Sequence, residues 1–487
     1  MEATSHDPRV RSILTSIVDL APESYVVGGA VRDLFLGRIK RKDLDVAVDG
    51  DGFEIARQVA TRSGSLTTFV PLDSKHGTGR IVLRGEPSLT LDVTSFRAST
   101  LAEDLRRRDF TINAMAVGIQ DFLFGCQDRV HDPTGGRADL RTKTIRACSK
   151  HCFQDDPVRI LRAFRFMARL EFEISEDTLE MLASALGMLA STAQERIRDE
   201  LIATLATESS FLALKQMDAC GVLDALFPEL LPTKGCDQND YHHLDVWNHS
   251  LETVFRMEAL LANKALQFGP LSDQIDAYAR QELVKDRPRV ALLKLAAIFH
   301  DAGKPESRFV DSKGRIRFFG HERISQQIFD EVGRRLKFAT REIGIIGEII
   351  AGHMRPTIFT GNGVSRRAIH RMHARFKRNV IGLLLLFLAD LGASRGPARR
   401  PEAYGQAWNQ VLRALAMCLE AEAAPLKPLL NGRDLMSQLR ISPGPHLGNL
   451  LRKLMELQAA GEITTRDEAV EAARRIFGGD SADHTPA

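Results

Sequence analysis

The 487-residue sequence lacks the marks of several large classes of protein. Its six cysteines form no CxxC pair and no regular array, which argues against a disulfide framework and suits a reducing compartment. The run CSKHC has no second ligand pair at zinc spacing, so we do not expect a zinc site there. Aromatic residues make up only 6% of the chain, and a formal charge of +3 provides no overall attraction for nucleic acid. Binding to an anionic partner must therefore depend on local basic clusters.

Long apolar runs are also missing. The longest, IGLLLLFLA at 381–389, is too short to span a bilayer and is typical of a buried helix. The N-terminal MEATSHDPRV is polar, so we expect no signal peptide. These absences predict a soluble cytoplasmic protein with no membrane partner, and the length predicts several domains.

Strand and helix signals divide the chain into a mixed head and a helical remainder. Five runs before residue 150 have strand-like patterns: SYVVGG, DLDVAV, GRIVLRG, LTLDVTSF and TINAMAVGI. Beyond them the periodicity is helical. We therefore predict an α+β fold with a mixed-sheet head and helices at 1–150, all-helical segments at 151–232, 233–400 and 401–475, and a disordered tail at 476–487.

The stretch VVGGAVRDLFLG predicts a buried strand, two glycines and a short helix. Such a turn presents the backbone N–H groups of Gly28 and Gly29 and a helix N-terminus to an anion. Arg32, one turn into the helix, can reach the same anion. Many turns of this kind contain glycine for geometry alone, so the stretch by itself does not establish a phosphate site.

Three aspartates point from predicted strands. In DLDVAV, alternation places Asp43 and Asp45 on the polar face, roughly 6.5–7 Å apart. At that spacing two carboxylates can converge on Mg²⁺, although a solvated strand gives the same pattern. Asp92 in LTLDVTSF also points from a strand face. If the two strands are neighbours, the three could surround a two-metal site, with Asp92 as a ligand or general base.

Arginine clusters follow the strands. RIKRK at 38–42 is one, and RRRDFTINA places Arg108 and Asp109 at the mouth of an apolar element. QDDPVRILRAFRFMARL predicts a helix with Pro157 at its first position and an aspartate cap. Its arginines recur at steps of three and four and form one stripe, Arg159, Arg162, Arg165 and Arg169. Triphosphate or RNA favours such clusters, although a solvated helix face is the ordinary explanation.

In this order and spacing, GGAVRD, DLD and RRDFTINA resemble the head of class II tRNA nucleotidyltransferases. That family comprises CCA-adding enzymes and bacterial poly(A) polymerases, with a DNA polymerase β-like head. The resemblance implies that Asp43 and Asp45 bind catalytic Mg²⁺ and that Asp92 is the further strand carboxylate. It also implies a set of nucleotide-binding residues, Gly28, Gly29, Arg32, Arg108 and Asp109.

The next helix resembles the nucleotide-reading part of the same family. DDPVR is similar to its EDxxR motif, with Asp in place of the usual Glu. Asp156 and Arg159 would act as a protein template, because a carboxylate accepts from the amino group of cytosine or adenine and a guanidinium donates to a ring acceptor. Uracil has the opposite polarity and is refused. Arg162 would support the nucleotide, while Glu195 and Arg196 of an ERxxxE-like motif would brace the neck helices.

A second group of residues resembles an HD phosphohydrolase domain. The HDAGK run after an apolar helix lies between further histidines and a late aspartate, whereas a lone buried histidine is usually a core residue. In such domains His and Asp side chains bind a divalent metal, of unknown identity here, and activate water. The resemblance implies the ligands His249, His300, Asp301 and Asp390, with His321 and His353 completing a second metal site or binding phosphate.

The C-terminal part and one short loop complete the sequence-based hypothesis. NGRDLM and PGPHLG resemble the body and tail that bind the tRNA acceptor arm. Only ASTLAE separates Arg97 from Asp104, where members that add complete CCA, and poly(A) polymerases, have a longer flexible loop. This favours addition of CC to tRNA from CTP over complete CCA addition from CTP and ATP. A poly(A) polymerase, or an RNA-binding phosphohydrolase with an inactive head, remains an alternative.

Overall fold

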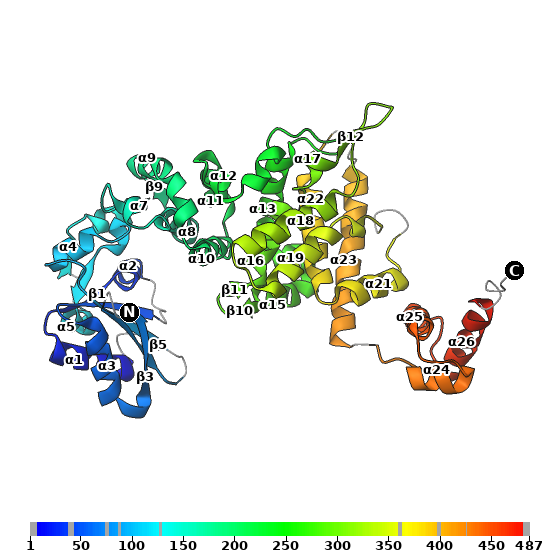
Figure 1. The fold of residues 1–487 in the computed structure, drawn as a ribbon, viewed down its shortest axis with the longest axis horizontal. Helices are drawn as coiled ribbons and strands as arrows, with labels where there is room; N and C mark the ends of the chain where they lie inside the picture. The colour runs from blue at the N-terminus through cyan, green and yellow to red at the C-terminus, as the bar shows by residue number, and fades with distance from the viewer. Residues whose placement is uncertain are drawn as a thin grey trace. The chain divides into compact units, whose positions relative to one another are not determined.

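The computed structural model describes residues 7–37, 43–73, 77–85, 89–125, 129–358, 363–396, 401–424 and 426–480. The chain divides into two compact units (Figure 1). Unit 1 comprises Met1–Thr204 and Leu212–Leu226, and unit 2 comprises Leu205–Phe211 and Phe227–Ala487. The basic run RIKRK, Cys126 and the last seven residues of the predicted disordered tail lie outside the described residues.

Unit 1 contains a seven-stranded sheet in the order β3-β4-β5-β2-β1-β6-β7. β2 and β5 are parallel, whereas the other neighbours are antiparallel, so the predicted mixed sheet is confirmed. The strands are β1 (Ser24–Val27), β2 (Asp43–Val48), β3 (Thr67–Asp73), β4 (Thr78–Leu83), β5 (Leu89–Ser95), β6 (Ala116–Gly118) and β7 (Val130–His131). TINAMAVGI forms a strand only in β6, and the sequence does not predict the largely exposed edge strand β3.

The two faces of this sheet differ in polarity. Val46, Ile81 and Val93 are buried on the face covered by α3 (Gly52–Arg62), which packs against α1 (Pro8–Leu20). The helix lies so close that a Cβ atom at Gly79 would come within 2.8 Å of the Ala56 Cβ. Because side chains alternate along a strand, the neighbouring residues of β2, β4 and β5 project from the opposite face.

Helices lie between and after the strands of unit 1, which also has one short parallel pair of strands, β8 (Thr144–Ile145) and β9 (Glu173–Ile174). The predicted start of the arginine-rich helix is wrong: α8 begins at Arg159, after a turn in which the Arg159 N–H donates to Asp156 O. Its aspartate cap is also absent, because the Asp156 carboxylate pairs with Arg196 instead. The other helices are α2 (Gly29–Phe35), α4 (Leu101–Arg106), α5 (Ile119–Phe124), α6 (Gly136–Arg141), α7 (Cys152–Asp155), α9 (Glu176–Ser184), α10 (Gln194–Leu205), α11 (Phe211–Ala219) and α12 (Val222–Leu226).

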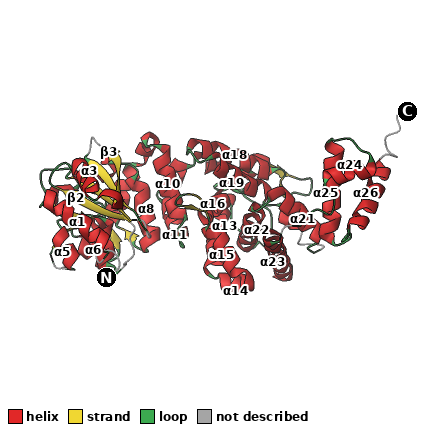
Figure 2. Cartoon of the chain, turned by 90° about the horizontal axis from the view of Figure 1, so that it is seen from below, coloured by secondary structure: helices red, strands yellow, loops and turns green. Residues whose placement is uncertain are grey.

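Unit 2 is almost entirely helical (Figure 2). Its core is built around α22 (Asn379–Ala393), which contains the predicted buried run and packs against α13, α16, α19 and α23. The surrounding helices are α13 (Val246–Ala262), α14 (Lys264–Phe268), α15 (Ser272–Arg280), α16 (Arg289–Phe299), α17 (Lys304–Ser307), α18 (His321–Arg335), α19 (Thr340–Gly352), α21 (Arg366–Phe376) and α23 (Pro401–Ala423). Two short hairpins interrupt them, β10 (Glu282–Val284) with β11 (Arg287–Pro288), and β12 (Arg308–Val310) with β13 (Ile316–Phe318).

Three C-terminal helices share a small core of their own. They are α24 (Gly432–Leu439), α25 (Pro445–Ala460) and α26 (Arg466–Asp480), and their buried residues include Leu435, Leu450 and Ala473. The prediction of disorder from residue 476 is wrong for the first five residues, because α26 continues to Asp480. Ile476 and Phe477 pack against this core, which the polar composition of the following residues conceals.

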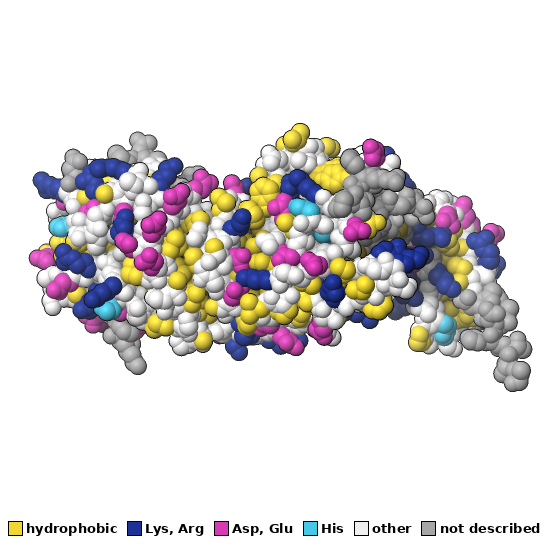
Figure 3. All heavy atoms as spheres, turned by 90° about the horizontal axis from the view of Figure 1, so that it is seen from above, with side chains coloured by type: hydrophobic (Ala, Val, Ile, Leu, Met, Phe, Trp, Pro, Cys, Tyr) yellow, Lys and Arg dark blue, Asp and Glu magenta, His cyan; other side chains and the backbone are white. Residues whose placement is uncertain are grey.

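The face drawn in Figure 3 carries charges of both signs, and the described helices include no candidate membrane span. Among the described residues, no helix is long and apolar enough to cross a bilayer. On that face, Lys and Arg side chains are interspersed with Asp and Glu. This mixture agrees with the nearly balanced charge of the sequence.

Candidate active sites

The polar face of the head sheet carries three carboxylates. Asp45 of β2 lies beside Asp92 of β5 in the register, and Asp43 is two residues before Asp45 on the same face. The two strands are therefore neighbours, which is the condition for the three carboxylates to share one site. Asp43 and Asp45 are exposed, and the Thr90 hydroxyl donates a hydrogen bond to Asp43. Oxygen donors of this kind fit a hard divalent cation.

Asp92 differs from the other two carboxylates because an arginine holds it. Arg80 of β4 lies opposite Asp92, and its Nε and Nη2 donate to the two carboxylate oxygens at 2.6 and 2.7 Å. Asp92 raises the pKa of the Arg80 guanidinium, burial opposes this rise, and Asp43 and Asp45 add to it more weakly. Arg80 is thus part of the charge balance of this face, although nothing in GRIVLRG distinguishes it in the sequence.

The paired glycines bring the turn after β1 against this carboxylate face. Gly28 has φ +71°, a left-handed conformation that favours glycine. A Cβ atom there would lie 3.2 Å from Asp45 Oδ2 and 3.6 Å from Arg108 Nη1. Arg32, in α2, is buried and donates to Asp33 at 2.8 Å and to Asn113 at 2.7 Å. The turn therefore lies directly against one carboxylate, Asp45, and one guanidinium, Arg108.

An arginine-rich cavity of about 410 Å³ lies beside the turn. Its charged lining consists of eight arginines and four aspartates: Arg32, Arg97, Arg108, Arg159, Arg162, Arg165, Arg169 and Arg196, with Asp45, Asp104, Asp109 and Asp156. The lining thus has a formal excess of four positive charges. The Phe166 ring lies 5.2, 5.6 and 4.5 Å from the guanidinium carbons of Arg32, Arg162 and Arg165. A polyanion fits this charge balance, and the ring stabilises the arginines through cation–π contacts.

A buried ion-pair network fixes the wall of the cavity. Arg162 donates to Asp109 Oδ2 through Nη2 at 2.6 Å and Nε at 3.0 Å. Glu200 of α10 accepts from Arg165 at 2.5 Å and from Arg162 at 3.4 Å. Burial alone would raise the pKa of Asp109, but the Arg162 guanidinium outweighs it and holds that pKa at about 2. Asp109 is therefore ionised at neutral pH and orients Arg162.

Replacing Asp109 by Asn should lower the free energy of unfolding by about 2 kcal/mol at pH 7, as expected for a pKa lowered by nearly two units. Because the folded-state pKa lies below the unfolded value, this stabilisation is complete above about pH 4 and is lost as the pH falls toward 2. Urea unfolding at decreasing pH should show the variant and the wild type converging. The exposed Asp155→Asn is the matched control, and a difference that stays constant down to pH 2 would contradict the prediction.

The two predicted template residues, Asp156 and Arg159, line the same cavity, but both are already hydrogen-bonded to other parts of the protein. The Asp156 carboxylate accepts from Arg196 at 2.7 and 3.0 Å. Arg159 is buried and donates to the backbone carbonyls of Arg107 at 3.0 Å and Cys152 at 3.2 Å. Arg196 therefore joins α10 to the segment before α8, as expected of a neck brace. A base read by Asp156 and Arg159 must share them with these contacts.

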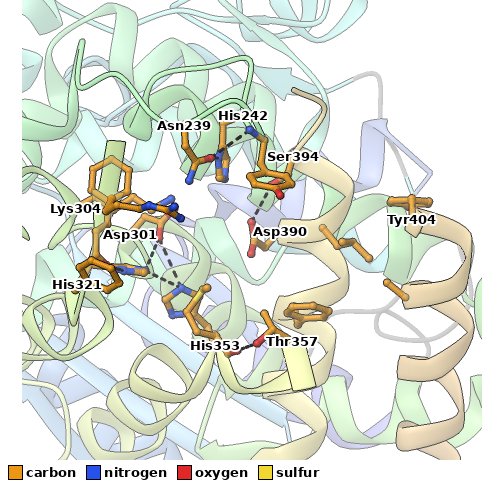
Figure 4. Close-up of a pocket in the computed structure, with 18 residues that line it drawn as sticks. Asn239, His242, Asp301, Lys304, His321, His353, Thr357, Asp390, Ser394 and Tyr404 are labelled. Atoms are coloured by element: carbon orange, nitrogen blue, oxygen red, sulfur yellow. Dashed lines mark hydrogen bonds and ion pairs between the residues drawn. The ribbon is translucent and has the colours of Figure 1, made fainter. Parts of the chain in front are cut away.

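The second cluster lies in unit 2 and surrounds Asp301 (Figure 4). Its members come from five helices and their ends: His249 of α13, His300 and Asp301 after α16, His321 of α18, His353 after α19, and Asp390 of α22. All six lie side by side, as the sequence predicts for an HD-like arrangement. Most of them are fully buried.

One half of the cluster joins four predicted ligands. The Nε2 atom of His249 is 3.0 Å from Asp390 Oδ1 and 3.7 Å from Asp301 Oδ2. The Nε2 atom of His300 is 3.1 Å from Asp301 Oδ2, while its Nδ1 bonds the carbonyl of Ala297 at 2.8 Å. The donor atoms of His249, His300 and Asp301 therefore lie within the reach of one metal ion, and Asp390 joins them through its contact with His249.

The other half contains His321 and His353 against the same aspartate. Their Nε2 atoms are 3.3 and 3.6 Å from Asp301 Oδ1 and 3.2 Å from each other. Each Nδ1 bonds a backbone carbonyl, that of Phe318 at 2.8 Å and that of Ile350 at 2.7 Å. These bonds direct both Nε2 atoms at Asp301. Asp301 thus bridges two groups of ligand atoms, each able to hold a metal.

The pKa shifts of most residues in this cluster favour the forms that bind metal. His300 is the exception, because burial would lower its pKa but Asp301 outweighs it and raises that pKa. Burial lowers the pKa of His353 to about 3 and also lowers that of His249. Burial acts against ionisation of Asp301, but His300 and Lys304 hold its pKa well below the usual value. Neutral imidazoles and ionised carboxylates are the forms that bind metal. In addition, Nε2 of His300 and Oδ1 of Asp301 are buried and make no hydrogen bond beyond the close approaches within the cluster, so the residues fit a divalent cation.

Two further residues of this cluster are not identified by the sequence. His242, within the polar break before α13, lies with His249 and Asp390 in a group able to hold a metal. Burial lowers its pKa to about 3, and its Nδ1 is 2.9 Å from Asn239 Oδ1. Lys304 places its Nζ 2.6 Å from Asp301 Oδ2. The first histidine of YHHLD and the lysine of HDAGK are the signals that could have revealed them.

Comparisons with known proteins match both sites to one kind of enzyme. The family described as Poly A polymerase head domain matches residues 24–146, that described as a probable RNA and SrmB-binding site of polymerase A matches 171–233, and the HD domain matches 246–390. An A-adding tRNA nucleotidyltransferase of Deinococcus radiodurans is 34% identical over 96% of this chain and 97% of its own. The chain belongs to the tRNA nucleotidyltransferase family.

Other members of the tRNA nucleotidyltransferase family show similar relationships. A CC-adding tRNA nucleotidyltransferase of Geobacter sulfurreducens is 34% identical over 92% of this chain and 90% of its own. A CCA-adding enzyme solved with CTP has 24% identity and a TM-score of 0.65, over 97% of this chain and 96% of that one. The Thermotoga maritima CCA-adding enzyme complexed with tRNA has the same identity and a TM-score of 0.62, over the same shares. These structures share the fold.

Proposed function

We propose that this chain is a template-independent polymerase that transfers CMP from CTP to the 3′ end of tRNA. The main support is the register that sets Asp43 and Asp45 on one sheet face, next to the Gly28 turn and the arginine-rich cavity. Relatives matched over nearly the whole chain are named CC-adding or A-adding tRNA nucleotidyltransferases, which supports the substrate class.

In the proposed reaction the tRNA 3′-hydroxyl attacks the α-phosphorus of CTP in line. The new O3′–P bond forms as the bond to pyrophosphate breaks, and the hydroxyl proton leaves to solvent. Asp43 and Asp45 would hold the divalent cations, Mg²⁺ in this proposal, whose charge offsets that developing on the phosphates. The N–H groups of Gly28 and Gly29 and the Arg108 guanidinium would position the triphosphate. Their positions are fixed before the nucleotide arrives, which favours catalysis by orientation.

Base selection is proposed for Asp156 and Arg159. A carboxylate that accepts from an exocyclic amine and a guanidinium that donates to a ring acceptor fit cytosine and adenine but not uracil. Arg196 can hold the Asp156 carboxylate in place, while the carbonyls around Arg159 fix its guanidinium plane. The two residues would thus discriminate by leaving the polar groups of a wrong base unpaired.

The short connection between β5 and α4 supports CC addition. β5 ends at Ser95, and α4 begins at Leu101 with Thr100 as its N-cap. Asp104 of α4 accepts from the backbone N–H of Arg97 at 2.9 Å, so it fastens the connection to the helix, and it also accepts from the Arg108 guanidinium at 3.1 Å. A segment held in this way offers little freedom to remodel the site for a second base. We therefore propose that synthesis stops after CC.

Transcripts of tRNA ending at the discriminator base, at C and at CC, incubated with labelled CTP or ATP, test this proposal. We expect two C residues on the first transcript, one on the second and no A on the third. Addition of A to the CC-ended transcript without C addition to the others would assign the chain to A addition. Addition of C to the first two transcripts together with addition of A to the third would assign complete CCA addition. Either result would contradict the CC proposal.

A second activity, hydrolysis of phosphate esters, is proposed for the HD-like cluster. Asp301, Lys304, His321, His353 and Asp390 face one cavity of about 670 Å³, whose other walls include aromatic side chains (Figure 4). Divalent cations held by the carboxylates and imidazoles would supply the charge that activates water. Lys304 would neutralise a phosphate oxygen at the same position. The volume exceeds what a phosphate alone needs, so an organic phosphate is the proposed substrate class.

A further inference from the structure

The head site contains a cation of its own in Arg80. Its guanidinium binds both oxygens of the Asp92 carboxylate, at 2.6 and 2.7 Å. The side chains are partly exposed, 36% for Arg80 and 23% for Asp92, so the pair lies at the surface of the carboxylate face and not in the core. A two-point contact of this kind fixes the carboxylate plane as well as its position.

The register places this pair against the cation-binding aspartates. Asp92 lies between Arg80 on β4 and Asp45 on β2, since β5 is the strand between them. Neighbouring strands are about 4.8 Å apart, so Asp92 is close enough to share a cation with Asp45. Asp43 lies on the same face and accepts from Thr90 of β5. Three negative charges and one positive charge therefore share one small area.

We infer that Arg80 is a positioning residue that holds Asp92 away from the cation-binding pair, so that Asp43 and Asp45 alone set the affinity for divalent cations. The inference rests on the proposed nucleotidyl transfer. With both Asp92 oxygens committed to Arg80, Asp92 is a counter-charge and a brace for β5. Arg80 also reduces the net charge of the three carboxylates from −3 to −2, which weakens cation binding before the nucleotide triphosphate arrives.

Arg80→Gln tests the inference because it removes both the positive charge and the two-point contact with the Asp92 carboxylate. Asp92 then becomes available to the cation, and the Mn²⁺ concentration for half-saturation should fall by about fivefold to tenfold. Mn²⁺ binding is followed by electron paramagnetic resonance in the full chain, without nucleotide or RNA. The part of the Mn²⁺ binding that is lost in Asp43→Asn/Asp45→Asn is assigned to the head site. Arg80→Lys keeps the charge and should shift the midpoint less.

Two controls separate this role from a general charge effect. Arg84→Gln removes the same charge four residues later, where the side chain donates to Thr68 at 3.1 Å, and should leave the midpoint unchanged. Arg80→Gln/Asp92→Asn replaces the ion pair by a neutral pair and should return the midpoint to near the wild-type value. An unchanged or weaker affinity in Arg80→Gln, or the same gain in the double variant, would overturn the inference.

The outcomes also distinguish the inference from the proposal it rests on. If Asp43→Asn/Asp45→Asn loses neither Mn²⁺ binding nor nucleotide incorporation, the proposed transfer site is wrong. If that variant loses both and Arg80→Gln does not shift the midpoint, only the role of Arg80 is wrong. Thermal unfolding of each variant shows whether the head sheet has formed, so a misfolded variant is recognised before its midpoint is interpreted.

Discussion

Asp43→Asn/Asp45→Asn should reduce nucleotide incorporation into tRNA by about a thousandfold or more, since several kcal/mol of charge stabilisation at the phosphates depends on cations held there. Both side chains are exposed on the polar face of the sheet, so neither contributes to the core. The change removes two like charges from one strand, and we expect the melting temperature to stay the same or to rise slightly. Incorporation is measured with labelled CTP and a tRNA transcript that ends at the discriminator base.

Asp49→Asn is the matched control for this variant. Asp49 is exposed and directly follows β2, so its replacement changes the charge of the same segment while both proposed cation ligands are kept. It should incorporate CMP at the wild-type rate. Incorporation that survives in Asp43→Asn/Asp45→Asn, with the protein folded, would contradict the proposed function and favour a head that only binds RNA.

The sequence predicts the elements of the head better than their contacts. Alternation in LTLDVTSF and in the first four residues of DLDVAV correctly indicates which residues are buried, because the pleat of a strand determines it. Ala47 is the exception, since it is buried although it shares a face with Asp45. The pairing of Asp45 with Asp92 depends on strand order, which follows from the packing of the whole sheet. Arg80 is the clearest case, since its partner comes from another strand and both residues look like ordinary solvent-facing positions.

The neck shows a different limit of sequence reasoning. The stripe of arginines on α8 is predicted by spacing, but its electrostatic partners are distant in the chain. Glu200 forms an ion pair with Arg165. Asp156 forms an ion pair with Arg196, so it does not serve as a helix cap. Capping rules consider only residues near the helix end, whereas here the carboxylate that could cap the helix pairs with an arginine that is distant in the sequence. The division of the helical part into three domains stays a prediction.

Both proposed sites follow one physical scheme. Each concentrates carboxylates at a place where one residue already supplies positive charge, Arg80 beside Asp92 and Lys304 beside Asp301. Without such partners, clustered carboxylates destabilise the fold or take up protons. The difference is burial: Asp301 is fully buried, whereas the head carboxylates meet solvent. We therefore expect removal of a charge to affect the fold more strongly in unit 2 than in the head.

Asp301→Asn should remove metal from unit 2 and lower the proposed phosphate ester hydrolysis at least a hundredfold, because Asp301 contributes an oxygen to both groups of ligand atoms. Metal content is measured by mass spectrometry after dialysis, and hydrolysis with a nucleoside monophosphate or a 2′,3′-cyclic nucleotide. Since the change leaves Lys304 without its carboxylate at 2.6 Å, it should also destabilise unit 2. His300→Ala provides a second variant in which that ion pair is kept.

The exposed Asp273→Asn on α15 is the control and should keep both metal and hydrolysis. CMP incorporation should survive in Asp301→Asn and His300→Ala, because the head site shares no ligand with this cluster. Parallel loss of incorporation in folded His300→Ala would refute two independent sites. Retained metal with lost hydrolysis would instead mean that Asp301 acts on the substrate and that the imidazoles and Asp390 hold the cation. The metal and activity measurements together therefore show whether Asp301, which contacts both halves of the cluster, acts as a metal ligand or acts on the substrate.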